Sequence, residues 1–285
     1  MQLSDFRFRE RLRVRWAEID AQKIVFNGHY LMYFDTAMAG YWRALAVPYA
    51  ETMEVFGGDT FVRKATVEYF SSARYDDVLE IGLRCARLGT SSMTFAGGVF
   101  RGQQLLVSCE LVYVFADPGA RGSRPLPGEL RAVINGFENG ESMLDVQVGT
   151  WHDLGEAARP VREAVFIGEQ NIPAALEWDE ADAVSVHAVA FNRLGRPLAT
   201  GRLLEHVPGV AKIGRMAVLE SSRHRGVGRA VLDALLDAAR ERGDGEALLH
   251  AQVGAVPFYE RAGFACRGAP FDDAGIAHVE MVRRL

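Results

Sequence analysis

The sequence predicts an α+β protein built from two domains, and three observations lead to this prediction. From Phe6 to Trp16 charged and apolar residues alternate, which is typical of a strand with one buried face. In residues 28–49 the apolar residues recur at helical spacing instead, which indicates one long helix with a continuous apolar stripe. Near Asn139 the order of elements changes, and helices and strands begin to alternate.

The first half is expected to fold as an antiparallel sheet wrapped around the long helix. Pro48 ends the helix, whose apolar stripe consists of Leu31, Phe34, Met38, Tyr41, Trp42 and Leu45. Four strand-like segments follow, namely TFVRKATVEYF, DVLEIGLRCARL, SSMTFAGGVF and QLLVSCELVYVFAD, with turn sequences between them. In the second segment apolar residues alternate with Glu80, Gly82 and Arg84, so one face of this sheet is expected to meet water.

The second half is predicted to run helix, strands, helix, strand, helix and strand. These elements are expected in RPVREAVFIGEQ, AVSVHAVAFNRLGRPLATGRLLE, KIGRMAVLES, SSRHRGVGRAVLDALLDAARERGD, EALLHAQ, AVPFYERAGF and AHVEMVRRL. Glycines and mixed polarity in residues 135–159 interrupt the pattern. We therefore expect one domain in residues 1–138 and a second in residues 139–285.

Composition and charge restrict the class of protein. The chain has 285 residues, enough for two ordinary cores, and a net charge of −5, so no basic field predicts a nucleic-acid partner. The three cysteines are far apart and form no CxxC, so we expect no disulfide framework and no metal. The N-terminus has no apolar leader and no segment long enough to span a membrane. A cytoplasmic protein without a membrane partner is expected.

The stretch RHRGVGR, residues 223–229, combines two glycines with three arginines at the start of a predicted helix. Glycines let a ligand approach the backbone, and the first N–H groups of a helix attract anions. Arginines donate charge-assisted hydrogen bonds to phosphate oxygens. The stretch therefore predicts a phosphate-binding loop, and the alternative is an ordinary glycine-containing loop with a solvated basic face. A Rossmann fingerprint fits poorly because Val231 holds the third glycine position, and the GK[ST] of a P-loop is missing.

RHRGVG also resembles the R-x-x-G-x-G/A pyrophosphate motif of the GNAT N-acetyltransferase superfamily, and AVPFYERAGF is similar to its F-Y-E-x-x-G-F segment. The resemblance implies a domain with a mixed, splayed sheet that binds coenzyme A or acetyl-CoA. It implies that backbone groups near Met216 and Val218 contact the pantetheine. It implies a pyrophosphate site made by Arg223, Arg225, Gly226, Val227, Gly228 and Arg229.

The same resemblance implies a general acid at Tyr259, which would protonate the departing CoA thiolate; the alternative is a core aromatic residue. It also implies that the acetyl group is transferred to an amine, of a small molecule or of a protein. Glu169, His187 and His278 are the candidate bases in segments expected at the acceptor side, and a structural role is the alternative for each.

In WAEIDAQKIVFNGHYLMYFD, Asp20 follows the first strand and Asn27 leads into the long helix. A carboxylate facing a helix N-terminus suggests acyl-transfer chemistry, because the helix N–H groups polarise a carbonyl while the carboxylate acts as nucleophile or general base. The alternative is that Asp20 caps a turn and Asn27 caps the helix.

The segment resembles the D-x-x-x-x-V-x-x-x-x-Y signature of hydroxybenzoyl-CoA-thioesterase-like hotdog proteins, here Asp20, Val25 and Tyr30. The resemblance implies a catalytic carboxylate at Asp20 and a backbone N–H at Asn27 that polarises the thioester carbonyl. It also implies a homo-oligomer formed through the hotdog domain. Lys23 departs from the pattern, since many relatives carry glycine there.

Both halves therefore indicate coenzyme A thioesters. The leading hypothesis is a bifunctional enzyme, an acyl-CoA thioesterase fused to an N-acetyltransferase. The alternatives are a thioesterase whose second domain only binds CoA or acetyl-CoA as a regulatory module, and a non-enzymatic hotdog scaffold that oligomerises an acetyltransferase.

Overall fold

The computed structural model describes residues 1–119, 122–273 and 275–285. The chain forms two compact units, Met1–Met143 and Leu144–Leu285. The boundary expected between residues 138 and 139 coincides with the end of helix α3 (Gly128–Glu138), and strand β6 (Leu144–Gly149) opens the second unit. Independent folding of the two domains stays a prediction.

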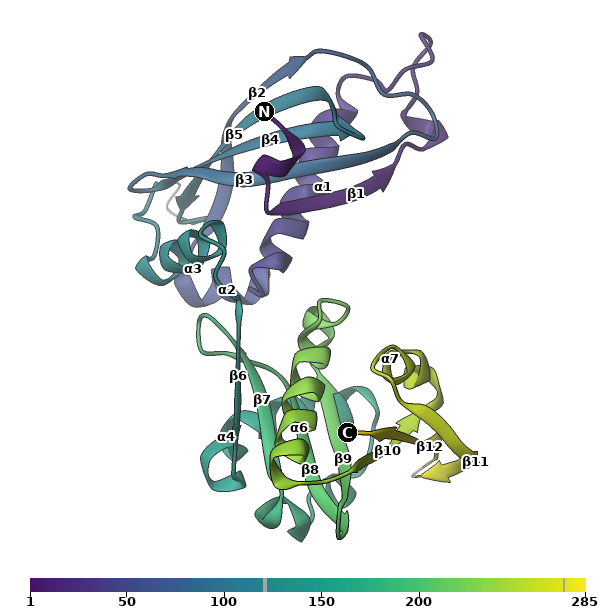
Figure 1. Ribbon diagram of the computed structural model, residues 1–285. Coiled ribbons are helices and arrows are strands. Elements are labelled where there is room, and N and C mark those ends of the chain that lie inside the picture. The colour runs from purple at the N-terminus through teal and green to yellow at the C-terminus, as the bar shows by residue number, and fades with distance from the viewer. Residues whose placement is uncertain (120–121, 274) are drawn as a thin grey trace. The chain divides into compact units, whose positions relative to one another are not determined.

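The first unit is a five-stranded antiparallel sheet packed against a long helix, as expected for a hotdog fold. Helix α1 (His29–Ala44) lies against one face of the sheet (Figure 1) and buries Tyr30, Phe34 and Tyr41. The strand order is β1-β3-β4-β5-β2. The strands are β1 (Phe8–Arg13), β2 (Asp59–Tyr69), β3 (Val78–Leu88), β4 (Ser92–Arg101) and β5 (Gln104–Ala116).

The sequence analysis missed two helices of this unit, α2 (Tyr49–Phe56) and α3. Pro48 ends the stripe of α1 but also serves as the N-cap of α2, and Gly57, with φ of 60°, ends α2. Helix α3 follows Pro127 and buries Leu130 and Ile134. Pro48 was interpreted only as a helix end and Pro127 only as part of a turn, although proline also favours the start of the next helix.

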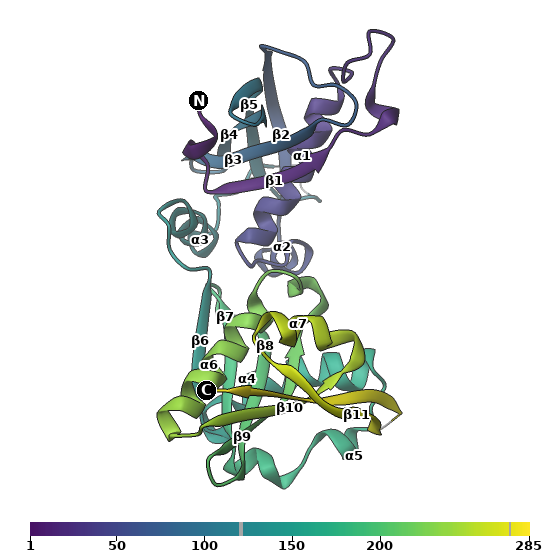
Figure 2. The ribbon, with the colours of Figure 1, turned by 45° about the vertical axis from the view of Figure 1, so that its right-hand side comes forward.

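The second unit is a seven-stranded mixed sheet, which confirms the expected sheet type. Its order is β11-β12-β10-β9-β8-β7-β6, and only the β9–β10 pair is parallel. Figure 2 shows β10, β11 and β12 together at one edge. The remaining strands are β7 (Val186–Asn192), β8 (Pro197–Val207), β9 (Val210–Val218), β10 (Glu246–Gln252), β11 (Ala265–Asp273) and β12 (Ile276–Arg284). Strands β6 and β11 were not anticipated.

Helices cover both faces of this sheet. Gly201 of β8 faces Val231 and Leu235 of α6 (Val227–Arg242). Val189 of β7 points to the opposite face, where it packs against Leu154 of α4 (Trp151–Arg162). A π-helix (Glu163–Glu169) continues α4, and α5 (Ala174–Glu177) and α7 (Val256–Arg261) are short.

The 3-10 turns are Leu3–Asp5, Trp16–Glu18, Glu180–Val184, Glu220–Ser222 and Val253–Ala255. Within the described ranges, no helix has both the length and the apolar content needed to cross a bilayer.

Candidate active sites

Asp20 lies at the tip of a clamped loop in the first unit. Residues 18–26 fold back on themselves through an antiparallel bridge between Ile19 and Val25 and a hydrogen bond from the Phe26 N–H to the Glu18 carbonyl (2.9 Å). The Asp20 N–H donates to the Ile24 carbonyl (2.9 Å) and closes the turn. The backbone that carries the carboxylate is therefore fixed on both sides.

Within this turn, only one of the two oxygens of the Asp20 carboxylate accepts a hydrogen bond. Its Oδ1 accepts a hydrogen bond from the Gln22 N–H (2.8 Å), while Oδ2 has no partner among the described residues. The backbone N–H of Asn27, at the other end of the loop, likewise has no acceptor in the described part of the chain. A half-buried carboxylate and an unsatisfied N–H thus flank the same loop, just before α1 begins.

The other signature residues attach this loop to residues 69–73. Val25 is buried, and its N–H donates to the Ala73 carbonyl (2.9 Å). The Ala73 N–H donates in turn to the Tyr30 hydroxyl (2.9 Å), and the Tyr69 hydroxyl donates to the Asn27 carbonyl (3.2 Å). The valine and the tyrosine of the signature therefore have a positioning role.

Glu18 and Tyr33, which the sequence analysis missed, connect the loop to α1. Glu18 is 3% exposed and accepts hydrogen bonds from the Tyr33 hydroxyl (2.8 Å) and the Arg15 N–H (2.7 Å). Burial alone would raise the pKa of Glu18, but these hydrogen bonds outweigh it and lower that pKa, so the carboxylate stays charged. The available signal was an acid two residues before Asp20 and a tyrosine three residues after Tyr30, on the same side of the helix.

An apolar groove of about 410 Å³ runs beside α1. The aromatic residues Phe34, Tyr41 and Trp42 belong to the core and do not line it. The exposed side of the helix lines it instead, together with strands β2 and β5. The lining residues are Leu31, Met32, Asp35, Thr36, Val62, Ala65, Leu111 and Tyr113.

The central feature of the second unit is an opening between two strands. Strands β9 and β10 pair over only four residues each, Val210 to Ile213 with Glu246 to Leu249. Beyond Ile213, the part of β9 that carries Met216 and Val218 has no pairing with β10. The Val218 carbonyl accepts a hydrogen bond from the Arg223 Nε (3.0 Å), so the stretch around Met216 is the part left open toward β10. Contact of these residues with pantetheine stays a prediction.

A β-bulge in β9 lies close to this opening. Opposite Gly201, strand β9 has two residues, Arg215 and Met216, in place of one, and Arg215 adopts a positive φ of 51°. Such a bulge leaves the extra residue outside the ladder and re-aims its backbone. The bulge lies directly after the point where the two strands stop pairing.

The residues predicted to bind pyrophosphate form one turn before α6. Gly226 is the N-cap of that helix with φ of 80°, and a Cβ added to it would lie in open space. Arg223 pairs with Glu169 of the π-helix, and Arg229 donates to both carboxylate oxygens of Asp233 (2.8 Å each). Arg225 is exposed in the same turn. The backbone of the turn is thus open at Gly226.

Tyr259 lines a cavity of about 430 Å³ that begins at this opening. Its side chain is 8% exposed, and its hydroxyl has no hydrogen-bond partner in the described ranges. Burial raises the pKa of Tyr259 to about 12, so it keeps its proton at neutral pH. Met216 lines the same cavity, whereas Val218 does not.

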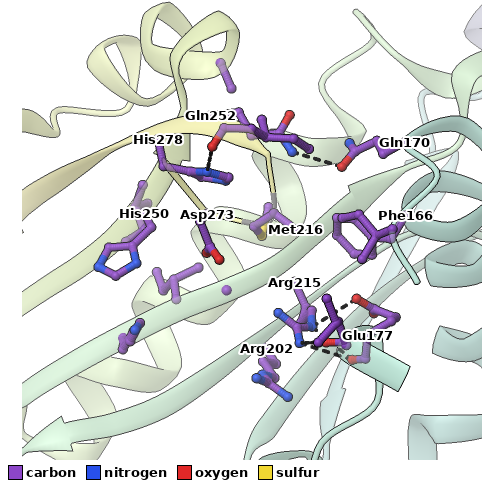
Figure 3. Close-up of a pocket in the computed structure, with 18 of the residues that line it drawn as sticks. Phe166, Gln170, Glu177, Arg202, Arg215, Met216, His250, Gln252, Asp273 and His278 are labelled. Carbon is purple, nitrogen blue, oxygen red and sulfur yellow. Dashed lines mark hydrogen bonds and ion pairs between the residues drawn. The ribbon is translucent and has the colours of Figure 1, made fainter. Parts of the chain in front are cut away.

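A cluster of arginines and acids closes one end of the cavity, and Figure 3 shows its members Arg202, Arg215 and Glu177. Arg202 donates to Asp179 and to Asp182 (2.7 Å), and its hydrogen bonds lower the pKa of Asp179. Arg215 pairs with Glu177 (3.1 Å). The cluster therefore compensates its own charges.

The candidate bases have different environments. His187 is 1% exposed, contacts the Asp182 carbonyl and does not line the cavity. Glu169 is held by Arg223. His278 does line the cavity, and so does His250, which the sequence analysis missed (Figure 3). Burial, and after it the charge of Lys212, lowers the pKa of His250, so its imidazole is neutral at neutral pH.

Comparison with known proteins assigns a family to each unit. Residues 157–285 match the acetyltransferase (GNAT) domain family, and residues 22–108 match the thioesterase superfamily. An uncharacterized N-acetyltransferase of Bacillus subtilis, YjcF, is 40% identical over 124 residues, 43% of this chain and 87% of that protein. A putative esterase of Aquifex aeolicus is 35% identical over 91 residues, 32% of this chain and 70% of that protein. The chain belongs to both families.

A further relative of the thioesterase domain is the acyl-CoA thioester hydrolase YbgC of Escherichia coli, 28% identical over 130 residues, which are 44% of this chain and 93% of that protein. The thioesterase match includes Asn27 and begins two residues after Asp20. The GNAT match includes the opening, the glycine turn and Tyr259.

Lys23 of the thioesterase domain stands at the position where glycine was expected, and its φ is 63°. A left-handed conformation costs a residue with a Cβ roughly 1 kcal/mol or more. We therefore expect Lys23→Gly to be more stable than Lys23→Ala by about 1 kcal/mol in chemical denaturation. Both variants remove the same charge, so equal stabilities would show that the turn is not strained.

Proposed function

We propose that this chain is a bifunctional enzyme that hydrolyses acyl-CoA in its thioesterase domain and acetylates an amine in its GNAT domain. The observation that supports hydrolysis most is the clamped loop, which carries the free Oδ2 of Asp20 and the free N–H of Asn27. A free N–H binds the thioester oxygen and stabilises the negative charge that develops on it.

In this proposal Asp20 either removes a proton from a water that attacks the polarised carbonyl, or attacks the carbonyl itself; in both cases the C–S bond breaks and the CoA thiolate leaves. In the second case the acyl group forms an anhydride with Asp20, and water then cleaves it to the free acid and restores the carboxylate. The groove beside α1 holds the acyl group of the substrate, because the apolar side chains of the groove (Leu31, Met32, Val62) shield that group from water.

Asp20→Asn is expected to lower kcat for acyl-CoA hydrolysis by at least about a hundredfold, since a positioned base or nucleophile contributes on that scale. An amide of the same shape can still accept from Gln22, so fold and CoA affinity should persist. Thiol release from a panel of acyl-CoA substrates measures the rate, and circular dichroism checks the fold. Full turnover in the folded variant would place the chemistry elsewhere.

For the GNAT domain we propose that acetyl-CoA enters the opening between β9 and β10, with its pyrophosphate on the glycine turn. The unpaired backbone after Ile213 meets the pantetheine, and the thioester lies near the cavity. His250 takes the proton from the amine, the amine nitrogen forms its bond to the acetyl carbon as the C–S bond breaks, and Tyr259 protonates the thiolate. Acetyl transfer thus requires the cavity as well as the cofactor turn.

Gly226→Val tests the cofactor turn. A β-branched residue at φ of 80° is strained and would project into the open space where the phosphate binds. We expect at least about a tenfold loss of CoA affinity at one of the two sites that calorimetry resolves in the full chain. Unchanged binding at both sites would contradict the proposed pyrophosphate site.

Gly209→Val is the matched control. Gly209 has the same φ of 80°, and its added Cβ would also meet open space, but it lies in the β8–β9 connection. It reproduces the strain without touching the glycine turn, so both CoA sites should persist in that variant. If CoA binds normally but no amine is acetylated, the GNAT domain is a CoA-binding regulatory module instead.

We also propose that the thioesterase domain pairs with a second copy through β2. This strand lies at the edge of the sheet and exposes Phe61, Val62 and Tyr69 by 47–56%. An exposed apolar edge strand is prone to pair with another strand. Such pairing would also bring a second chain close to the groove, which Val62 lines.

Val62→Glu should weaken this association at least about tenfold, because it places a charge in a desolvated contact. Sedimentation velocity over a concentration series measures it. Val55→Glu is the matched control, since Val55 is 80% exposed and belongs to α2, not to the edge strand. A monomeric wild type, or equal association of both variants, would contradict the β2 interface.

A further inference from the structure

The acceptor end of the GNAT cavity has a floor made by neighbouring strands. Arg202 of β8 is paired in register with Gly214 of β9, and Leu204 with Lys212, so these side chains share one face of the sheet. A Cβ added to Gly214 would meet nothing within 4 Å, which leaves the middle of the floor open. His250 of β10 also lines this part of the cavity.

The direction of the cofactor places Lys212 beyond the thioester. The glycine turn follows the end of β9, so the proposed pantetheine path runs backward along that strand, past Met216 toward Gly214. The path must stop where β9 and β10 begin to pair, at Ile213. Lys212 lies past that point, about 7 Å from Gly214 at the usual rise of a strand.

Lys212 is the cavity's uncompensated cation. Its ammonium has no hydrogen bond or ion pair among the described residues, although it is half-buried. Arg215, by contrast, is held by Glu177 and Asp179. Among the described lining residues the remaining cation is Arg202, which is 6% exposed and whose charge is compensated by Asp179 and Asp182. The Lys212 ammonium therefore makes the local potential on the floor positive, and an anionic group would pair with it.

The acidic residues near Lys212 do not neutralise the charge of its ammonium. Glu177 is committed to Arg162 and Arg215, and Glu280, which lies beside His250, is paired with Arg267. Asp273 has no hydrogen bond or ion pair among the described residues, is exposed, and acts electrostatically on His250. A molecule with one anionic and one amino group therefore fits the two unpaired charges better than a simple amine does.

We infer that the acceptor of the GNAT domain is a small amine that also carries a carboxylate, an amino-acid-like molecule whose carboxylate binds Lys212. This inference rests on the proposed acetyl transfer and adds the substrate class. The amino group lies over Gly214 beside His250, within reach of the thioester. The cavity of about 430 Å³ has room for a molecule of that size next to the end of the cofactor.

The test compares matched acceptors with the full-length chain. Glycine, L-phenylalanine, L-glutamate and L-lysine are each offered beside their C-terminal amides with acetyl-CoA, and the N-acetyl products are counted by mass spectrometry. Product counting separates transfer from any hydrolysis of acetyl-CoA by the thioesterase domain. For at least one of these acids, kcat/KM should exceed that of its amide by at least about tenfold.

Lys212→Met should bring this ratio close to one, mainly by raising KM for the acid, and Lys212→Glu should favour the amide. Lys64→Met is the control, because it removes the same charge from a surface ion pair of the thioesterase domain. An unchanged ratio in the folded Lys212 variants would overturn the inference. So would equal use of acids and amides, or no acetylation of either by a CoA-binding wild type. Absence of CoA binding at the GNAT domain would instead overturn the proposed function itself.

Discussion

The short pairing between β9 and β10 is the constraint on which the GNAT domain depends. Strand β9 has nine residues and β10 has seven, but they form only four residue pairs. The rest of β9 is not paired with β10. Unpaired backbone groups are costly in a protein interior unless water or a ligand satisfies them. The bulge at Arg215 and Met216 lies next to this opening, so in the proposed function the sheet itself would supply hydrogen bonds to an amide-containing cofactor arm.

The buried ion cluster holds the opposite wall of the cavity in place. Arg162 is 1% exposed and donates to Glu177 and Asp182 (2.8 Å to the latter), while its guanidinium lies over the Trp178 ring at 4.7 Å. Removing one partner from such a cluster typically costs 3–5 kcal/mol, because a charge stays buried without compensation. The segment between the π-helix and β7 contains little regular structure, and this cluster provides the interactions that fix it.

The sequence predicted the fold class because the features that indicate it are local, and local motifs also indicated the candidate site residues, whose roles stay predictions. Strand alternation, the stripe of α1 and the glycine turn before α6 each lie within one short stretch. His250, Lys212 and Glu18 were missed because their significance is not local. His250 and Lys212 matter only through the register of adjacent strands, and Glu18 matters because it is buried against Tyr33. At Lys23 the pattern showed only a departure from glycine, and the left-handed conformation (φ of 63°) came from the structure.

In the proposed function the two domains act on one kind of bond, a CoA thioester, in different surroundings, and this difference explains how they would give different products. The Asp20 carboxylate is half-buried on a loop tip and has one oxygen without a partner among the described residues, a position that would favour hydrolysis. In the GNAT cavity the proposed proton donor Tyr259 is buried, and burial keeps both Tyr259 and the proposed base His250 uncharged at neutral pH. A neutral base beside an enclosed thioester favours an amine that binds there, because water has no carboxylate for Lys212 to hold.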